Sequence, residues 1–337
     1  DEQPGSASSD DEDDDEQGPE EDDAGGDGEK PAGAGETVGG RPLGKRKRSH
    51  VVLSNGRMAS TKVRNHVNPL LPHFNKPVAV PEGGDWSKVF QDPSKPLVMD
   101  LGCAKGRFCL EGARRFPDFN WIGIEIREPL VVRANEWVTE GNLRNLHYIF
   151  GNASAGIADL LKALPSGALR RVTVQCPDPC FKKRHQKRRM VTQRLVQELG
   201  VGMPVGSALF VQSDVEQVAM QMVDTVMACA PHAFMRVDRL SDGAGAALDP
   251  SAPVEPVRRV NATAGRDYKD KDVGGGKWEH KGAGADAEGS YRWLAENPLG
   301  LMSERESSTI SRGLPMFRAL FERVAQPPPT GEAKPAA

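Results

Sequence analysis

The chain has 337 residues and a formal net charge of −3, with 38% hydrophobic residues. Residues 1–30 hold fifteen Asp or Glu side chains against one lysine, so they carry −14 and the other 307 residues carry +11. A mean hydropathy of −0.52 and the lack of any run of about 18 apolar residues exclude a membrane-spanning helix. Five cysteines are too few for a disulfide scaffold, and the basic body indicates a nucleic acid or another polyanion as partner.

The first 50 residues are predicted to form a disordered acidic tail that ends in a basic run. Residues 1–44 are rich in Asp, Glu, Gly, Pro and Ala and bury too little apolar surface to offset the entropy of ordering. The basic run at 45–48 is typical of a nuclear-import signal or a phosphate-binding arm, but also of an ordinary solvated cationic run. Six prolines between residues 51 and 96 predict an extended, irregular lead-in.

Between residues 97 and 324, short apolar runs alternate with amphipathic segments. Strands are predicted at 97–101, 121–125, 146–150, 171–176, 208–213 and 316–324, with helices at 107–115, 129–140, 158–163, 191–199 and 215–229. This alternation indicates a mostly parallel sheet covered by helices on both faces, in one α/β domain. The segment 241–290, in which Gly, Ala, Asp and Ser dominate, is interpreted as a disordered insertion, and 325–337 as a disordered C-terminal tail.

Three polar motifs follow the first three predicted strands. A glycine turn spans 100–106, Glu125 ends the second strand, and Gly151-Asn152-Ala153 follows the third. Because the carboxyl ends of parallel strands meet at one edge, we expect the motifs to lie together. The Gly-x3-Gly spacing of the turn matches neither a dinucleotide fingerprint nor a P-loop, and Glu125 can accept both hydroxyls of a ribose. The set predicts an S-adenosylmethionine pocket, although each motif alone is also ordinary turn chemistry.

A rigid carboxylate and a dense basic run follow the fourth strand. Prolines flank Asp178, which fixes the backbone on both sides of this side chain. Six of the eight residues from 182 to 189 are Lys or Arg, which favours a grip on nucleic-acid phosphates over a merely solvated face. Cys176, Cys180 and His185 supply three soft ligands where a structural zinc site needs four, so no metal is predicted. His66 is isolated in the sequence and is expected to have a structural or surface role.

This segment, with Asp178 and the pattern Lys182-x-Arg184-His185-x-Lys187-Arg188-Arg189, resembles the signature of the tRNA (guanine-N7)-methyltransferases. The resemblance covers roughly residues 62–240 and 291–324 and favours the bacterial and plant organellar branch. It implies the class I methyltransferase fold, a Rossmann-like seven-stranded sheet with its last strand antiparallel. It also implies S-adenosylmethionine as cofactor, the variable-loop guanine at position 46 of tRNA as substrate, and activity without a membrane, a metal or an obligatory partner subunit.

The resemblance also implies roles for individual residues. The S-adenosylmethionine site would comprise Asp100, Gly102, Glu125, Arg127, Asn152 and Ala153. Asp178 would be the catalytic aspartate, and contacts to the guanosine would come from Lys182, Asp214, Ser303 and Glu306. The tRNA backbone would lie against Lys183, Arg184, Lys187, Arg188 and Arg189. The sequence departs from the family pattern at Cys180, where an aromatic residue or His is common, and mildly at Ser303, where the family has Thr.

The chemistry of guanine explains why a carboxylate serves this reaction. N7 carries a free lone pair, so no general base has to remove a proton before attack, whereas a carboxylate can accept the N1–H and amino donors and reject adenine. Two other functions stay open: a methyltransferase that acts on another RNA, a protein or a small molecule, and a non-catalytic RNA-binding protein. The basic run favours the nucleus and the branch resemblance favours a plastid or mitochondrion, so the compartment also stays open.

Overall fold

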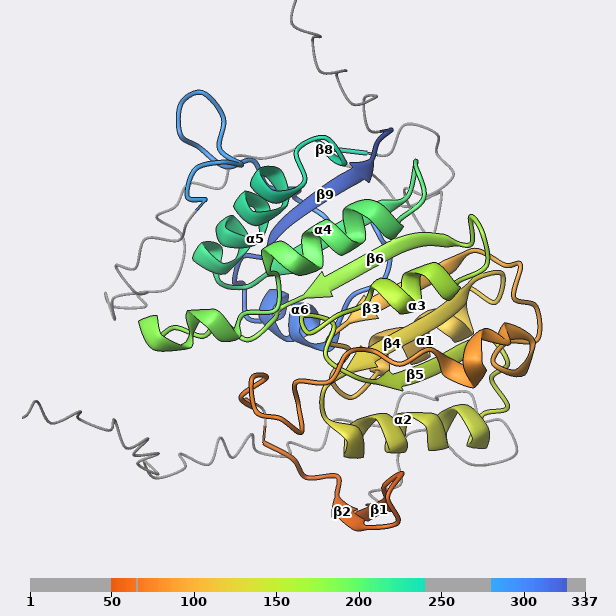
Figure 1. Cartoon of the computed structure of the whole chain (residues 1–337). Helices are drawn as coiled ribbons and strands as arrows, with labels where there is room; N and C mark the ends of the chain where they lie inside the picture. Colours follow the sequence, from red (N-terminus) through yellow and green to blue (C-terminus); the bar gives the residue numbers. More distant parts are fainter. Residues whose placement is uncertain (1–49, 65, 240–279, 326–337) are drawn as a thin grey trace, which may run out of the picture. The chain divides into compact units, whose positions relative to one another are not determined.

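The structure is a computed structural model that describes residues 50–64, 66–239 and 280–325 (Figure 1). The disorder predicted for the N-terminal tail, for most of the insertion and for the C-terminal tail falls on residues outside these ranges. In chain order the elements are β1 (His50–Val52), β2 (Met58–Ser60), η1 (Pro81–Gly84), η2 (Trp86–Lys88), β3 (Leu97–Leu101), α1 (Arg107–Arg115), β4 (Asn120–Glu125), α2 (Glu128–Glu140), β5 (Leu146–Phe150), α3 (Ala158–Ala163), β6 (Leu169–Gln175), η3 (Lys183–Arg188), α4 (Gln193–Gly202), β7 (Ala208–Ser213), α5 (Glu216–Cys229), β8 (Phe234–Val237), α6 (Glu304–Ile310) and β9 (Phe317–Arg323).

Seven of the described strands form one sheet in the order β5-β4-β3-β6-β7-β9-β8. The strands from β5 to β7 in this order pair in parallel, and β9 runs antiparallel to both β7 and β8. The strand order reverses between β3 and β6, which is where open α/β sheets bind their ligands. The predicted seven-stranded sheet with an antiparallel last strand is confirmed.

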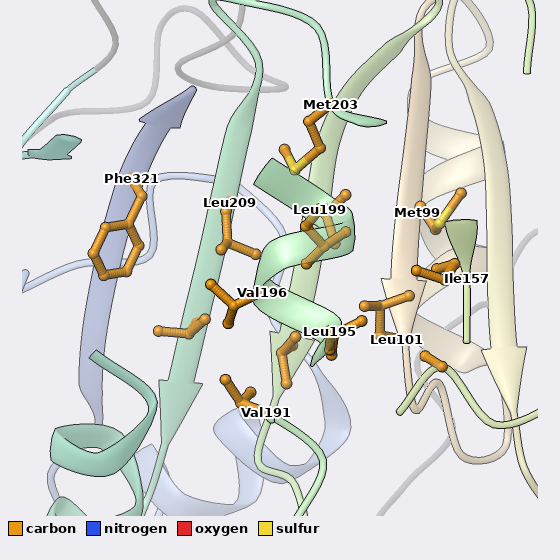
Figure 2. Close-up of a cluster of buried hydrophobic side chains, with 14 of the residues drawn as sticks. Met99, Leu101, Ile157, Val191, Leu195, Val196, Leu199, Met203, Leu209 and Phe321 are labelled. Carbon is orange, nitrogen blue, oxygen red and sulfur yellow. The ribbon is translucent and has the colours of Figure 1, made fainter. Parts of the chain in front are cut away.

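Helices cover both faces of the sheet because the side chains of each strand alternate between two apolar clusters. Met99 and Ile122 belong to the cluster shared with α3, α4 and α5, whereas Val98 and Trp121 belong to the cluster shared with α1 and α2. Figure 2 shows the first cluster, in which Leu195 of α4 lies among side chains from the strands. Within the described ranges, no helix is long and apolar enough to cross a membrane.

The predicted strands and helices of the domain are present, with ends that shift by up to three residues. Helix α4 begins at Gln193, two residues later than predicted, because the Thr192 side chain accepts a hydrogen bond from the Leu195 amide and caps the helix. Among the strands and α-helices described between residues 97 and 324, two were not predicted. Strand β8 has four residues and pairs with β9 alone, and α6 depends on a capping box at Ser303.

The lead-in is more structured than the predicted extended segment. Its residues 50–60 include the hairpin β1–β2, which is tied to α2 because the Ser54 amide and hydroxyl both donate to Glu128. Further along, Trp86 and Phe90 are buried in the core, and the Trp86 indole nitrogen donates to the Ala163 carbonyl at 2.6 Å. The prolines keep the backbone of this segment irregular, but burial of the aromatic rings holds the segment against the domain.

The chain that returns from the insertion is anchored on α5. Asp224 is completely buried and accepts hydrogen bonds from the amides of Gly282 and Gly284 and from the Tyr291 hydroxyl, at 2.7–3.0 Å. The predicted disorder therefore does not extend to residues 280–290. A buried carboxylate has to be hydrogen-bonded, and here it orders a segment whose composition alone indicates a loop.

Replacement of Asp224 by alanine tests this anchor. We expect Asp224→Ala to lower the free energy of unfolding by about 3 kcal/mol, because buried donors lose their acceptor. Urea denaturation of both proteins measures the difference. The control is Asp238→Ala, which removes an exposed ion pair with Arg292 and is expected to cost less than about 1 kcal/mol. Similar losses in the two variants would contradict the anchoring role.

Candidate active site

The glycine turn after β3 has the backbone geometry that only glycine adopts easily. Gly102 and Gly106 have φ angles of +79° and +76°, in the left-handed region. A Cβ atom on Gly102 would lie 2.6 Å from the Met190 methyl group, and one on Gly106 would lie 2.5 Å from the Tyr148 ring. The turn therefore lets the backbone come close to its surroundings, as a ligand cradle requires.

Asp100 links the two strands between which the strand order reverses. Its Oδ1 accepts hydrogen bonds from the Thr173 hydroxyl at 2.5 Å and from the Gln175 amide at 3.1 Å, both on β6. Burial raises the pKa of Asp100 to about 6, although these two hydrogen bonds act to lower it. Through these hydrogen bonds, this side chain links the start of the glycine turn to β6.

Glu125 ends β4, where its carboxylate is almost completely buried. One oxygen accepts from the Ala104 amide at 2.8 Å and from Arg127 Nη2 at 3.1 Å, and the other accepts from the amide and Nε of Arg127 at 3.0 and 2.8 Å. These four bonds match the four acceptor positions of a carboxylate. Burial lowers the pKa of Arg127, but the hydrogen bonds and charge of Glu125 outweigh it and raise that pKa.

The polar groups after β5 bind the lead-in. The Asn152 amide nitrogen of the backbone donates to the Lys76 carbonyl at 2.8 Å, and its side chain donates to the Pro69 carbonyl at 3.2 Å. The side-chain oxygen accepts from the Ser154 amide at 3.0 Å, and Ala153 is buried. The side chain predicted to read an adenine edge is thus engaged by the chain itself, and its contact with a cofactor stays a prediction.

The loop after β6 holds Asp178 in a strained backbone. Cys176 and Cys180, on either side, both have a φ of +47°, which is uncommon for residues other than glycine. Asp178 Oδ1 accepts from the Cys180 amide at 3.1 Å, and Oδ2 lies 2.7 Å from His66 Nδ1. Burial raises the pKa of Asp178, but the hydrogen bonds from His66 and Cys180 outweigh it and hold that pKa below its usual value. His66, which is isolated in the sequence, is therefore an exposed side chain whose partner is Asp178.

The basic run forms η3, the green helical turn that projects beyond the tip of β6 (Figure 1). Lys182, Arg184 and Lys187 are exposed, and Arg188 is half-buried. Arg189 differs, because its side chain is buried and its Nε donates to the Pro179 carbonyl at 3.1 Å. The contact of Arg189 with tRNA phosphates stays a prediction, and in this structure its side chain serves the loop that carries Asp178. The structure describes the backbone but not the side chain of Lys183.

The late segment around α6 closes the same edge of the sheet. Ser303 caps the helix, and Arg305 donates to Asp214 Oδ2 at 2.6 and 2.9 Å. Glu306 is completely buried, and its carboxylate accepts from Arg318 at 2.8 and 3.1 Å. It also accepts from Asn297 and Gln212 at 2.7 and 3.0 Å. Donors from β7, β9 and the segment before α6 thus occupy this carboxylate, and the contact of Glu306 with guanosine stays a prediction.

A concavity of about 750 Å³ lies beside this edge, between α1 and α6. Its lining includes Arg107, Trp137 and Ser303, and the Arg107–Glu304 ion pair of 2.5 Å crosses it. Neither Glu125 nor Asp178 lines it. The described residues also contain no cluster of three or more His, Cys, Asp or Glu side chains that is arranged to hold a metal ion.

The strand order, the glycine turn and the acidic end of β4 together define a class I methyltransferase. A family model described as "Putative methyltransferase" matches residues 94–248. A tRNA (guanine-N(7)-)-methyltransferase from Trichormus variabilis is 39% identical over 264 residues, which cover 78% of this chain and 97% of the relative. The enzyme of that name from Synechococcus elongatus is 39% identical over 266 residues, 79% and 98% of the two chains. The chain belongs to the tRNA (guanine-N7)-methyltransferase family, as its motifs predicted.

The residues at the carboxyl edge fit S-adenosylmethionine, the methyl donor of this family. Gly102 and Gly106 leave the turn without side chains, and Glu125 stands where a ribose is bound in folds of this kind. Because Arg127 and the Ala104 amide together fill the acceptor positions of Glu125, a ribose hydroxyl has to replace one of these bonds. The role of each cofactor residue stays a prediction.

Substitution of Glu125 tests the cofactor site. We expect Glu125→Gln to weaken binding of S-adenosylhomocysteine by about tenfold or more, because a charge-assisted hydrogen bond contributes about 1.5–3 kcal/mol. Isothermal titration calorimetry measures the affinity. The control is Glu140→Gln at the end of α2, which removes an acid that pairs with Arg133 at 3.5 Å and should leave the affinity unchanged. An unchanged affinity for Glu125→Gln would remove this residue from the cofactor site.

Proposed function

We propose that the protein transfers the methyl group of S-adenosylmethionine to N7 of a tRNA guanine, the variable-loop guanine at position 46. The observation that carries this proposal is the placement of Asp178. A rigid, ionised carboxylate follows β6 directly, between the glycine turn after β3 and the exposed cations of η3. The names of the similar proteins support N7 of a tRNA guanine as the target, and position 46 is proposed from the resemblance of the motifs.

The reaction asks the protein mainly for position and charge complementarity. S-adenosylmethionine supplies an activated methyl group on a sulfonium. Asp100, Gly102 and Glu125 would hold this donor at the ends of β3 and β4. N7 needs no prior loss of a proton, and the N7–CH3 bond would form as the S–CH3 bond breaks and S-adenosylhomocysteine leaves. Asp178 accepts the N1–H and amino donors of guanine, which orients the ring, excludes adenine and stabilises the positive charge that methylation creates.

The exposed cations of η3 bind the tRNA backbone next to this carboxylate. Lys182, Arg184 and Lys187 present their charges to solvent on a segment that starts four residues after Asp178. Phosphate contacts release counterions and fix the position of the tRNA, while Asp178 reads the base. The variable-loop guanine has to leave its tertiary contacts to reach the site. The chain acts without an obligatory partner subunit in this proposal.

Loss of the carboxylate tests the catalytic role. We expect Asp178→Ala to reduce methyl transfer by at least about 100-fold while tRNA affinity stays within about twofold, because the phosphate contacts remain. The purified chain is incubated with unmodified tRNA and labelled donor, and borohydride–aniline cleavage locates 7-methylguanine. Undiminished turnover by Asp178→Ala would contradict the role of this residue. Label incorporated at another base, or into protein, would instead favour a different substrate.

Removal of two exposed cations tests the tRNA surface. We expect the double variant Arg184→Ala, Lys187→Ala to bind tRNA more weakly and to lower the slope of log affinity against log salt by about 2, one for each lost phosphate contact. Filter binding at several salt concentrations measures both quantities. Lys162→Ala on α3 is the control, since this side chain is 76% exposed and precedes β6, away from the carboxyl edge. An unchanged salt slope would place the tRNA elsewhere.

A further inference from the structure

We propose that His66 is a positioning residue that holds the Asp178 carboxylate for guanine recognition. The inference rests on the function proposed for Asp178. His66 Nδ1 lies 2.7 Å from Asp178 Oδ2, while the Cys180 amide donates to Oδ1 at 3.1 Å. The two oxygens thus have separate partners from separate parts of the chain, since His66 and Asp178 are 112 residues apart.

The segment that carries His66 is fixed to the domain on both sides of it. Before it, the Arg64 carbonyl accepts a hydrogen bond from Arg127 Nη1 at 3.3 Å. After it, the Pro69 carbonyl accepts from the Asn152 side chain at 3.2 Å. These two contacts lie at the ends of β4 and β5, on the same side of β3, whereas His66 between them reaches Asp178 after β6. The placement of His66 therefore follows from backbone anchors that are independent of Asp178.

Two partners restrict Asp178 more than one does. The Cys180 amide belongs to the same short loop and holds one oxygen, which leaves the carboxylate plane free to rotate about this contact. The imidazole fixes the second oxygen and therefore the plane. The Cys180 side chain also hydrogen-bonds this carboxylate. A carboxylate has about four acceptor positions, and those that these partners leave are open to the N1–H and amino donors of guanine. Fixed orientation before binding is what in-line methyl transfer requires.

Charge reinforces the hydrogen bond. The bond to Asp178 raises the pKa of His66, while partial burial and the positive charge of Arg127 act to lower it. The charge of Asp178 also acts to raise the pKa of His185, but burial and the cations around it hold that pKa below its usual value. His66 consequently keeps its proton to a higher pH than a free histidine does. The positive charge of His66 is lost as the pH rises through this raised pKa. Its attraction for the Asp178 carboxylate is therefore complete at lower pH and declines on the alkaline side.

The variants His66→Ala and His66→Asn separate positioning from simple packing. The side-chain amide of asparagine places an N–H donor close to the position of Nδ1, whereas alanine has none. We expect His66→Ala to lower kcat by roughly tenfold or more, with the affinities for S-adenosylhomocysteine and tRNA unchanged within about twofold. His66→Asn should recover most of kcat. It should also lack the decline in kcat that the wild-type enzyme shows as the pH rises through the pKa of His66.

His73→Ala and Asp178→Ala complete the design. His73 lies in the same lead-in, is exposed and contacts Phe74, so its loss should leave kcat unchanged. If Asp178→Ala retains wild-type turnover, the function proposed for Asp178 fails. If Asp178→Ala is inactive but His66→Ala is fully active, only the role of His66 fails. The role of His66 is also overturned if His66→Ala weakens tRNA binding and thermal stability in step with kcat, or if His66→Asn is no better than His66→Ala.

Discussion

The site depends on the parallel, in-register pairing of β3 with β4 on one side and with β6 on the other. Leu101, the last residue of β3, pairs with Ile124 and with Val174, so three strands end at the same level. The glycine turn, Glu125 and the Asp178 loop all lie within a few residues of these three strand ends. Asp100 strengthens the pairing of β3 with β6, because its side chain accepts hydrogen bonds from β6 at the point where the strand order reverses.

Three acidic side chains near the ends of these strands have a cationic partner, which is two residues away for Glu125 and far along the chain for Asp178 and Asp214. Arg127 binds Glu125, His66 binds Asp178 and Arg305 binds Asp214. An acid that is partly removed from water needs such a partner to remain ionised. The partners of Glu125 occupy the acceptor positions that a ribose would use, whereas Asp178 keeps acceptor positions for guanine. Binding of the ribose is therefore an exchange of hydrogen bonds, and its free energy is the difference between the two sets.

The sequence predicted the elements that local pattern determines. Apolar runs located the strands of the parallel sheet, and the prolines around Asp178 indicated a rigid loop after β6. Prediction from the sequence failed where a residue's partner is distant in the chain. His66 has no local feature that points to Asp178, and β8 exists only because β9 lies beside it. Arg189 reads as one more cation in a basic run, yet its side chain turns inward to the Pro179 carbonyl. The buried Asp224 likewise orders a segment that resembles a loop.

The sequence alone determined the fold class, the family and the order of the motifs, because hydrophobic period, glycine turns and proline-flanked residues act over a few neighbouring positions. The tertiary structure decided which side chains face the substrate and which serve the protein itself. Glu306 and Asp178 are both acids in family motifs, but one is completely buried against Arg318 and the other is open to solvent beside His66. Exposure and hydrogen-bond partners depend on segments that are distant in the chain, and only folding brings those segments together.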